Sequence, residues 1–181
     1  MKTNFKEIVT RAKNIIIVPK DEWNIIVNEN KTSTEVLLGY MIWLILIPVF
    51  AVLIGWNDHL SYGIKLAVQQ VVSIIAGCYL MAWILNELAE KYGAAKNFDR
   101  AFGLIAYCYT ADCISGIFMM IPALKFLSVL GSLYSFYLLY TGIRPMMNVP
   151  EEKVNNYYII SLLCMIGISL LVSAIYNFII F

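Results

Sequence analysis

The residue best suited to chemistry is Asp112, an ionisable side chain near the middle of a long apolar segment. An ionisable group is costly to hold at membrane depth, so its presence there indicates a function or a specific contact. At helical spacing, Cys108, Ser115 and Gly116 share its face. This small and polar face is therefore expected to point into a helix bundle and away from lipid.

Two interpretations of Asp112 stay open. In the first, the carboxyl group forms a site for protons or cations, and other polar groups of the bundle assist it; the candidates are Tyr109, Tyr134, Gln69 and Ser73. In the second, the carboxyl group stays protonated and hydrogen-bonds a neighbouring helix, as polar groups in membrane bundles commonly do. The same packing role is the simpler explanation of Gln69 and Ser73.

A stripe of small residues marks the best candidate for a helix-packing interface. Its members follow the spacing i, i+3, i+4 and i+7 and are Ser128, Gly131, Ser132 and Ser135. Small side chains on one face let two helix backbones approach closely within a membrane. The sequence does not say whether the partner helix belongs to the same chain or to another copy.

Templates for catalysis are not met. His59 is the single histidine, so neither a histidine metal cluster nor a Ser–His–Asp site inside the apolar segments can be assembled. The four cysteines lack the C-x-x-C spacing of a redox or zinc site and are expected to be buried thiols. No phosphate-binding glycine motif is present. We expect no enzyme activity, no cofactor and no metal.

The elements that must position these residues follow from composition. Apolar residues make up 61% of the 181 positions and charged residues 14%, which is too little polar surface for a water-soluble domain. A helix needs about 20 apolar residues to cross a bilayer. The sequence predicts an all-α protein with five such helices: Leu38–Trp56, Ile64–Leu85, Ala101–Ile121, Leu124–Thr141 and Tyr157–Phe181. The third and fourth are separated by almost nothing, so they form either a tight spanning hairpin, which we favour, or a shorter re-entrant one.

The distribution of basic residues predicts the orientation of the bundle. With the N-terminus in the cytoplasm, eleven of the thirteen Lys and Arg residues fall on the cytoplasmic side, and only Lys65 and Lys125 fall outside. Such an excess is the positive-inside pattern. The C-terminus is then expected outside, and no basic stripe suited to nucleic acid exists beyond the membrane segments.

Residues 1–36 are predicted to form a cytoplasmic arm, separate from a transmembrane domain over 37–181. Phe5, Ile8, Ala12 and Ile15 recur at helical spacing, and the basic residues among them are Lys2, Lys6, Arg11 and Lys13. This pattern is typical of an amphipathic helix on a membrane surface. A second short helix from Pro19 is expected to turn Trp23 and Ile26 toward the membrane; the alternative is a partly ordered arm.

The sequence also resembles a known family. The resemblance runs from Arg11–Ile15 and Pro19–Trp23 through Lys96–Phe98, Tyr107–Thr110, Gly116–Phe118 and Ile121–Leu124 to Tyr134, Tyr137–Tyr140, Gly142 and Val149–Lys153. In order and spacing these segments resemble the Ypt-interacting-protein (Yip) family, in particular its short bacterial members. The resemblance implies a five-helix bundle with a cytoplasmic N-terminus, an adaptor role among membrane proteins in eukaryotic relatives, and no catalytic residues.

Two functions follow as hypotheses. The preferred one is a non-enzymatic integral membrane protein of a bacterial inner membrane, which organises other membrane components through a membrane-protein partner or its own oligomer. The alternative is a small oligomeric channel or transporter for protons, cations or a small solute, built on Asp112 and the bundle tyrosines.

Overall fold

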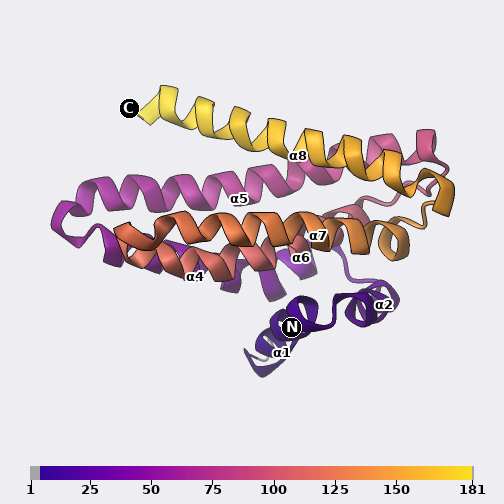
Figure 1. The fold of residues 1–181 in the computed structure, drawn as a ribbon, viewed down its shortest axis with the longest axis horizontal. Coiled ribbons are helices and arrows are strands. Elements are labelled where there is room, and N and C mark those ends of the chain that lie inside the picture. The colour runs from indigo at the N-terminus through magenta and orange to yellow at the C-terminus, as the bar shows by residue number, and fades with distance from the viewer. Residues whose placement is uncertain (1–4, 181) are drawn as a thin grey trace.

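The computed structural model describes residues 5–180, and within them every regular element is a helix (Figure 1). Five helical stretches are long and apolar enough to cross a membrane: Ser33–Gly55, Asn57–Tyr92, Phe98–Met120, Ala123–Met147 and Glu151–Tyr176. These are the five predicted spans, so the all-α, five-span fold is confirmed. Most run beyond the predicted limits, because helical hydrogen bonding continues through polar residues such as Asn86 and Glu87 that hydropathy leaves out.

The arm and the first two spans contain most of the elements. The arm holds α1 (Phe5–Ile17) and α2 (Pro19–Glu29). The first span begins with α3 (Ser33–Val36), passes through one π-helical segment (Leu37–Met41) and continues as α4 (Ile42–Gly55). Thr32 caps α3 in a capping box with Glu35, which stabilises the start of the helix. The second span is α5 (Leu60–Ala89), with a short 3₁₀ turn at each end (Asn57–His59 and Glu90–Tyr92).

The third and fourth spans form a tight hairpin. The helix α6 (Phe98–Ser115) tightens into a 3₁₀ segment (Gly116–Met120), and a second 3₁₀ segment (Pro122–Leu127) leads into α7 (Ser128–Met147). The third and fourth spans contain 23 and 25 residues, and each is long enough to cross a bilayer. Length therefore supports the spanning form of the hairpin. The last span is α8 (Glu151–Ile180).

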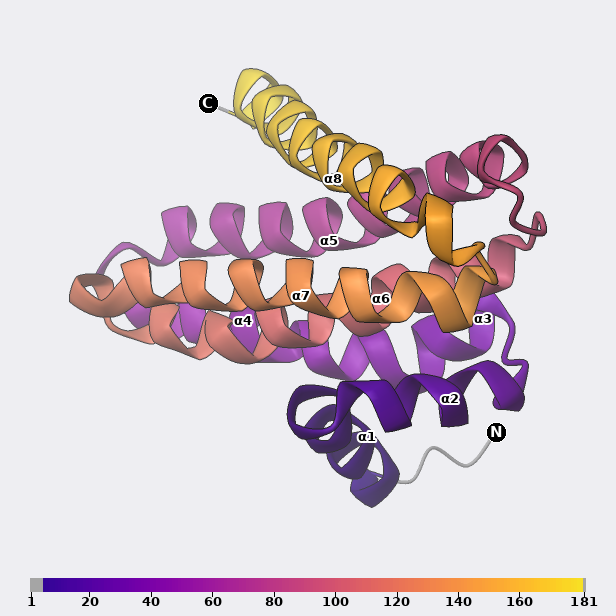
Figure 2. The same ribbon diagram turned by 45° about the vertical axis from the view of Figure 1, so that its right-hand side comes forward.

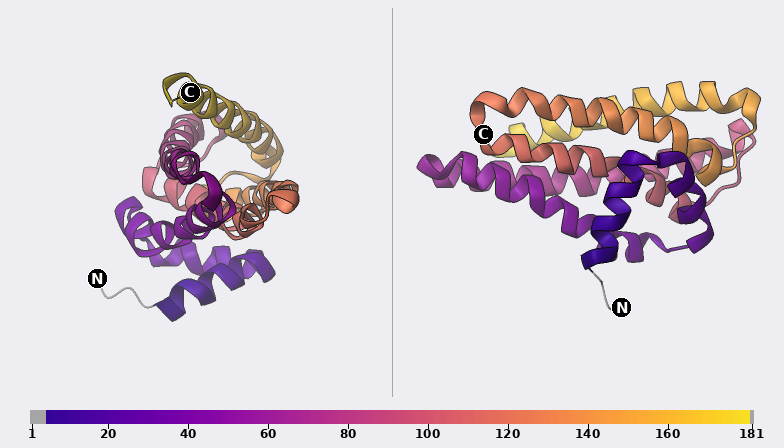
Figure 3. Two further views of the ribbon diagram at one scale, coloured as in Figure 1. Left: turned by 90° about the vertical axis from the view of Figure 1, so that its left-hand side faces the viewer. Right: turned by 60° about the horizontal axis from the view of Figure 1, so that its bottom comes forward.

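The helix α6 is at the centre of the molecule. It packs against α7 most extensively, and also against α4, α5 and the arm. In the end-on view of Figure 3, α8 lies at one edge of the bundle and the arm at the opposite edge. The core is consequently built around α6. In its most apolar stretch 67% of the residues are buried, against 17% in that of α8.

One end of the bundle collects basic residues, and we call it the basic end. The α5–α6 and α7–α8 connections meet there, at the right of Figure 1, and the space beside Gly93 is closed by Pro150 and Lys153. Ion pairs between Lys96 and Glu87 and between Arg144 and Glu151 lie at this end. The predicted cytoplasmic location of this end follows from its charge.

Candidate functional site

Asp112 lies in the last turn of α6 and is held by two serines of α7. Ser132 donates to one carboxylate oxygen over 2.6 Å, and the hydroxyl of Ser135 lies 2.9 Å from the other. Ser135 also lies 2.8 Å from the carbonyl oxygen of Cys108, one turn earlier on α6. The acidic side chain is therefore the centre of a polar contact that joins two helices.

The same contact explains why α7 carries small residues. Ser115 donates toward the carbonyl oxygens of Asp112 and Ser128, each at 3.1 Å. A Cβ atom on Gly131 would lie 2.6 Å from the Ala111 carbonyl oxygen and would overlap the Ser115 hydroxyl. Only glycine fits at this crossing, which brings the two backbones close enough for the hydroxyl bridges.

The spacing of residues on α6 and α7 contains a signal for this site. Positions 108, 111, 112 and 115 of α6 repeat the spacing of 128, 131, 132 and 135 of α7, so two short or polar stripes of equal length were available to pair. The sequence-based prediction places Asp112 in a polar site and the serines in a separate packing interface. The structure joins them in a single site.

The other residues proposed to assist Asp112 point elsewhere. The Tyr109 hydroxyl lies against Gly77 of α5, where an added Cβ would come within 3.0 Å. Tyr134 donates over 2.6 Å to the carbonyl oxygen of Ile16, in the arm. Gln69 and Ser73 are half-buried on α5, and within residues 5–180 neither is hydrogen-bonded to Asp112. The five residues thus do not form one polar cluster.

The arm is docked on the side of the bundle, which corrects the prediction that Trp23 and Ile26 face the membrane. Trp23 is fully buried, Ile26 is nearly so, and the Trp23 indole N–H donates to Thr141 over 3.1 Å. Gly142 provides the slot, since a Cβ there would come within 2.7 Å of the indole ring. A buried tryptophan needs a partner for its N–H, and α7 supplies both that partner and the space.

The corner between α1 and α2 reaches well along the bundle. Tyr134, which bonds Ile16, lies thirteen residues before Met147, the end of α7. At the rise of an α-helix this is roughly 20 Å from the basic end. The arm therefore lies along the helices, as Figure 2 shows, and is not spread flat across their ends. Ile17 and Val18 at the corner are exposed, as suits a segment at membrane depth.

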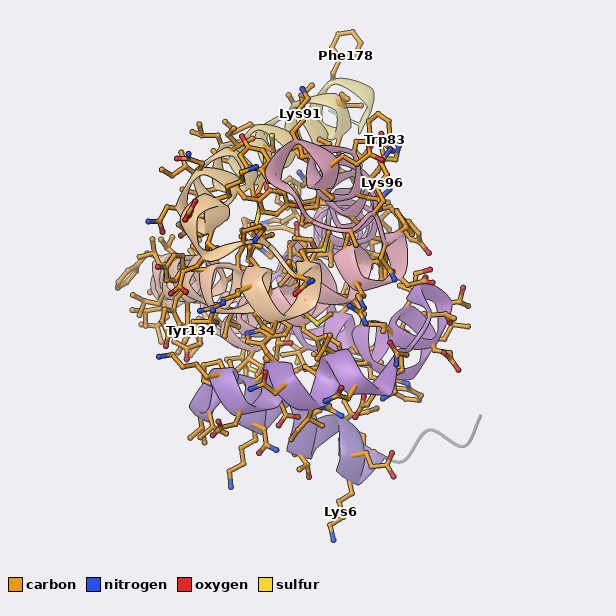
Figure 4. All side chains as sticks on the ribbon, turned by 90° about the vertical axis from the view of Figure 1, so that its right-hand side faces the viewer. Lys6, Trp83, Lys91, Lys96, Tyr134 and Phe178 are labelled. Carbon is orange, nitrogen blue, oxygen red and sulfur yellow. The ribbon has the colours of Figure 1, made fainter. Side chains whose placement is uncertain are left out.

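The basic residues of the arm divide into two groups. Arg11 is paired with Glu22 at 2.5 Å and with Glu29, so it ties α1 to α2. Burial works against the charged guanidinium, but Glu29 and Glu22 outweigh it and raise the pKa of Arg11. Lys6 and Lys13 are exposed, and Lys6 projects away from the bundle in Figure 4. Lys2 lies outside the described residues.

Beside this ion pair is a cleft of about 640 Å³ between the arm and the start of the first span. Its polar lining includes Arg11, Glu22, Glu29 and Tyr107. Across residues 5–180 no group of three His, Cys, Asp or Glu side chains is placed to hold a metal ion. The cleft and the Asp112 contact are thus two separate polar sites of the described residues.

Comparison with known proteins gives the family. The Yip1 domain matches residues 13–174, which include much of the arm as well as the five spans. The chain belongs to the Yip1 domain family. The resemblance stated from the sequence is thus confirmed.

Among curated proteins, the chain is 26% identical over 151 residues to the inner membrane protein YohC of Escherichia coli strain K12. The match covers 75% of this chain and 77% of that protein, and the YohC of a second strain, O6:H1, matches equally. No solved structure matches the chain. Together with its five apolar helices, the family membership identifies an integral membrane protein.

Proposed function

We propose that this member of the Yip1 domain family is a non-catalytic protein of a bacterial inner membrane that binds a helix of a partner membrane protein. The observation that carries the proposal is the bare apolar face of α8. The basic end of the bundle is proposed to face the cytoplasm, with the arm lying against the side of the helices on that half of the membrane. The inner-membrane location is supported by the name of the relative in E. coli.

The exposed face of α8 has the pattern of a helix-packing surface. Leu163, Gly167, Leu170 and Ala174 recur at i, i+4, i+7 and i+11 and are all exposed. The two leucines are 62% and 67% exposed, and a Cβ on Gly167 would meet nothing within 4 Å. Large side chains that alternate with small ones allow a second helix to pack closely in a membrane, where association depends on such contacts.

The helix is nevertheless firmly attached along its opposite face. Tyr157 donates to the carbonyl oxygen of Leu85 over 2.7 Å, and Tyr176 to that of Lys65 over 2.5 Å. Both bonds tie α8 to α5, near its two ends. In Figure 2, α8 crosses over α5 and diverges from α7. An arrangement of this kind holds the bare face in place for a partner.

Transport remains the second function raised by the sequence, and no contact observed here favours it. The carboxylate of Asp112 is occupied by Ser132 and Ser135, which suits a packing role. The tyrosines proposed to assist it serve other helices, Tyr109 at α5 and Tyr134 at the arm.

Site-specific photo-crosslinking in native membranes tests the proposal. A photoreactive residue is placed at Leu163 or Leu170 on α8 and, as a matched control, at Phe50 or Ile54, which are similarly exposed on α4. We expect one reproducible protein adduct from the α8 positions and none from α4. Capture of lipid alone at all four positions would overturn the proposal, and an adduct between two copies would replace the partner with an oligomer.

A further inference from the structure

We propose that the cleft between the arm and the first span binds the headgroup of a zwitterionic phospholipid with a primary ammonium group, such as phosphatidylethanolamine. A cavity of about 640 Å³ is within the range of small-molecule sites. This inference is independent of the α8 partner, because the arm, which forms one wall of the cleft, lies at the opposite edge of the bundle from α8.

The position of the cleft fits a headgroup. One wall comes from α1 and α2, and the other from Val36, Gly39 and Tyr40 of the first span. Ser33, where that span begins, is bonded to Asp99 at the basic end, and Tyr40 lies seven residues further along. At the helical rise this is roughly 10 Å, so the cleft lies where a bilayer changes from headgroup to acyl chain.

The charges around the cleft fit a group that carries both signs. Four carboxylates line it, from Glu7, Glu22, Glu29 and Glu35, together with the cations Lys6, Arg11 and Lys31. Arg11 is paired with Glu22 and Glu29, and Lys31 with Glu29, so the cleft presents ion pairs of both signs and no single-sign patch. A lone phosphate would lie beside the carboxylates, and a lone amine beside the cations. A phosphate with a tethered ammonium can place each charge beside its opposite, and a primary ammonium can also donate hydrogen bonds to the carboxylates.

Tyr107 supplies a donor that the protein itself does not use. It lines the cleft and is only 2% exposed, yet its hydroxyl forms no hydrogen bond with any residue in the described part of the chain. Its ring packs against Tyr40 and Trp23, so the side chain is fixed in place. The hydroxyl oxygen is accessible from the cleft and is not sealed inside the protein, so a phosphate oxygen in the cleft could accept its hydrogen bond.

Apolar groups complete the site. Ile8, Ile25 and Val36 lie in the lining with the charged residues. They offer contact for the glycerol backbone and the first methylene groups of the acyl chains, which a free soluble headgroup lacks. The combination distinguishes a lipid from a water-soluble ligand.

Native mass spectrometry of the delipidated full-length protein tests the inference. Phosphatidylethanolamine and phosphatidylglycerol with identical acyl chains are titrated onto the wild-type protein and onto Tyr107→Phe. We expect the wild-type protein to bind phosphatidylethanolamine about tenfold more tightly than phosphatidylglycerol, and Tyr107→Phe to lose about five- to tenfold of that affinity, as one charge-assisted hydrogen bond warrants. Tyr92→Phe, at the α5–α6 connection and outside the cleft, is the matched control and should bind as the wild type does.

Two further measurements make the result decisive. Glycerophosphoethanolamine, which carries the headgroup without acyl chains, should displace the lipid only at a much higher concentration. Lys31→Gln, on the exposed side of the lining, should weaken binding too and covers the case in which Tyr107→Phe does not fold. Equal affinity for the two lipids, or wild-type binding by both variants, would overturn the inference.

Discussion

Two of the five spans, α6 and α8, differ in burial, and hydropathy alone would predict the opposite order of burial. The most apolar stretch of the α6 span has a mean hydropathy of 1.4, and 67% of its residues are buried. That of the α8 span has a mean hydropathy of 2.4, and 17% of its residues are buried. The more polar helix is therefore the central one. In water the opposite would hold, because burial there follows apolar surface.

The reason is the solvent. Lipid is as apolar as leucine, so a leucine-rich helix gains little by leaving it, and a helix with hydroxyl, thiol and carboxyl groups must find partners inside the bundle. On α6 those groups include Thr110, Asp112 and Ser115, each hydrogen-bonded to another element. On α8, Ser161 and Ser169 bond only carbonyl oxygens of their own helix. Four changes would sharpen this contrast or break it.

The largest effect is expected at the glycines. Gly131→Ala forces a methyl group into the Ser115 hydroxyl and the Ala111 carbonyl, and should lower the free energy of unfolding by about 3 kcal/mol. Gly167→Ala on α8 meets open space and should be neutral or stabilise by up to about 1 kcal/mol. Unfolding of both variants in mixed micelles titrated with sodium dodecyl sulfate measures the difference. Equal losses would mean that α6 is not the central helix.

Next is the carboxyl group itself. Asp112→Leu removes the acceptor of Ser132, while Ser135 keeps only the Cys108 carbonyl oxygen, and should cost about 2 kcal/mol in the same unfolding assay, with Asp112→Asn costing about half as much. Ser169→Ala on α8 is the control and should change stability by less than about 0.5 kcal/mol.

Asp112→Asn also decides between packing and transport. We expect proton and cation flux into liposomes to be the same for the wild-type protein and Asp112→Asn, because the carboxylate serves as a helix contact. A wild-type flux that disappears in Asp112→Asn would revive the transport hypothesis.

A smaller effect is expected at the attachment of α8. Tyr157→Phe removes the buried bond to the Leu85 carbonyl oxygen and should cost about 1 kcal/mol. Hydrogen exchange should rise along α8 and stay unchanged in α6, since the two helices are held by different contacts. Faster exchange in both would indicate that α8 supports the core.

The smallest change in stability is expected on the bare face. Leu170→Ala removes an exposed side chain and should alter the free energy of unfolding by less than about 0.5 kcal/mol. Crosslinking from Leu163 should nevertheless fall in this variant, because the same face receives the proposed partner. Undiminished crosslinking would place the partner elsewhere.

Sequence reasoning succeeded where one residue's own chemistry was enough. The small-residue stripe of α7 could be predicted because it depends on local spacing. It failed for Trp23, which looked like a membrane-facing aromatic and is in fact buried beside Gly142. Its partner lies more than a hundred residues away, and periodicity within the arm contains no information about that distance.

The sequence by itself determined that this chain is an integral membrane protein with five helices and one basic end. Those properties follow from the transfer of each residue between water and lipid, which adds along the chain. Only the tertiary structure decided that Asp112 belongs with the serines of α7, that the arm folds onto the bundle, and that α8 keeps a bare face. These depend on which turn of one helix meets which turn of another, and that choice is made by shape and hydrogen bonding between distant segments.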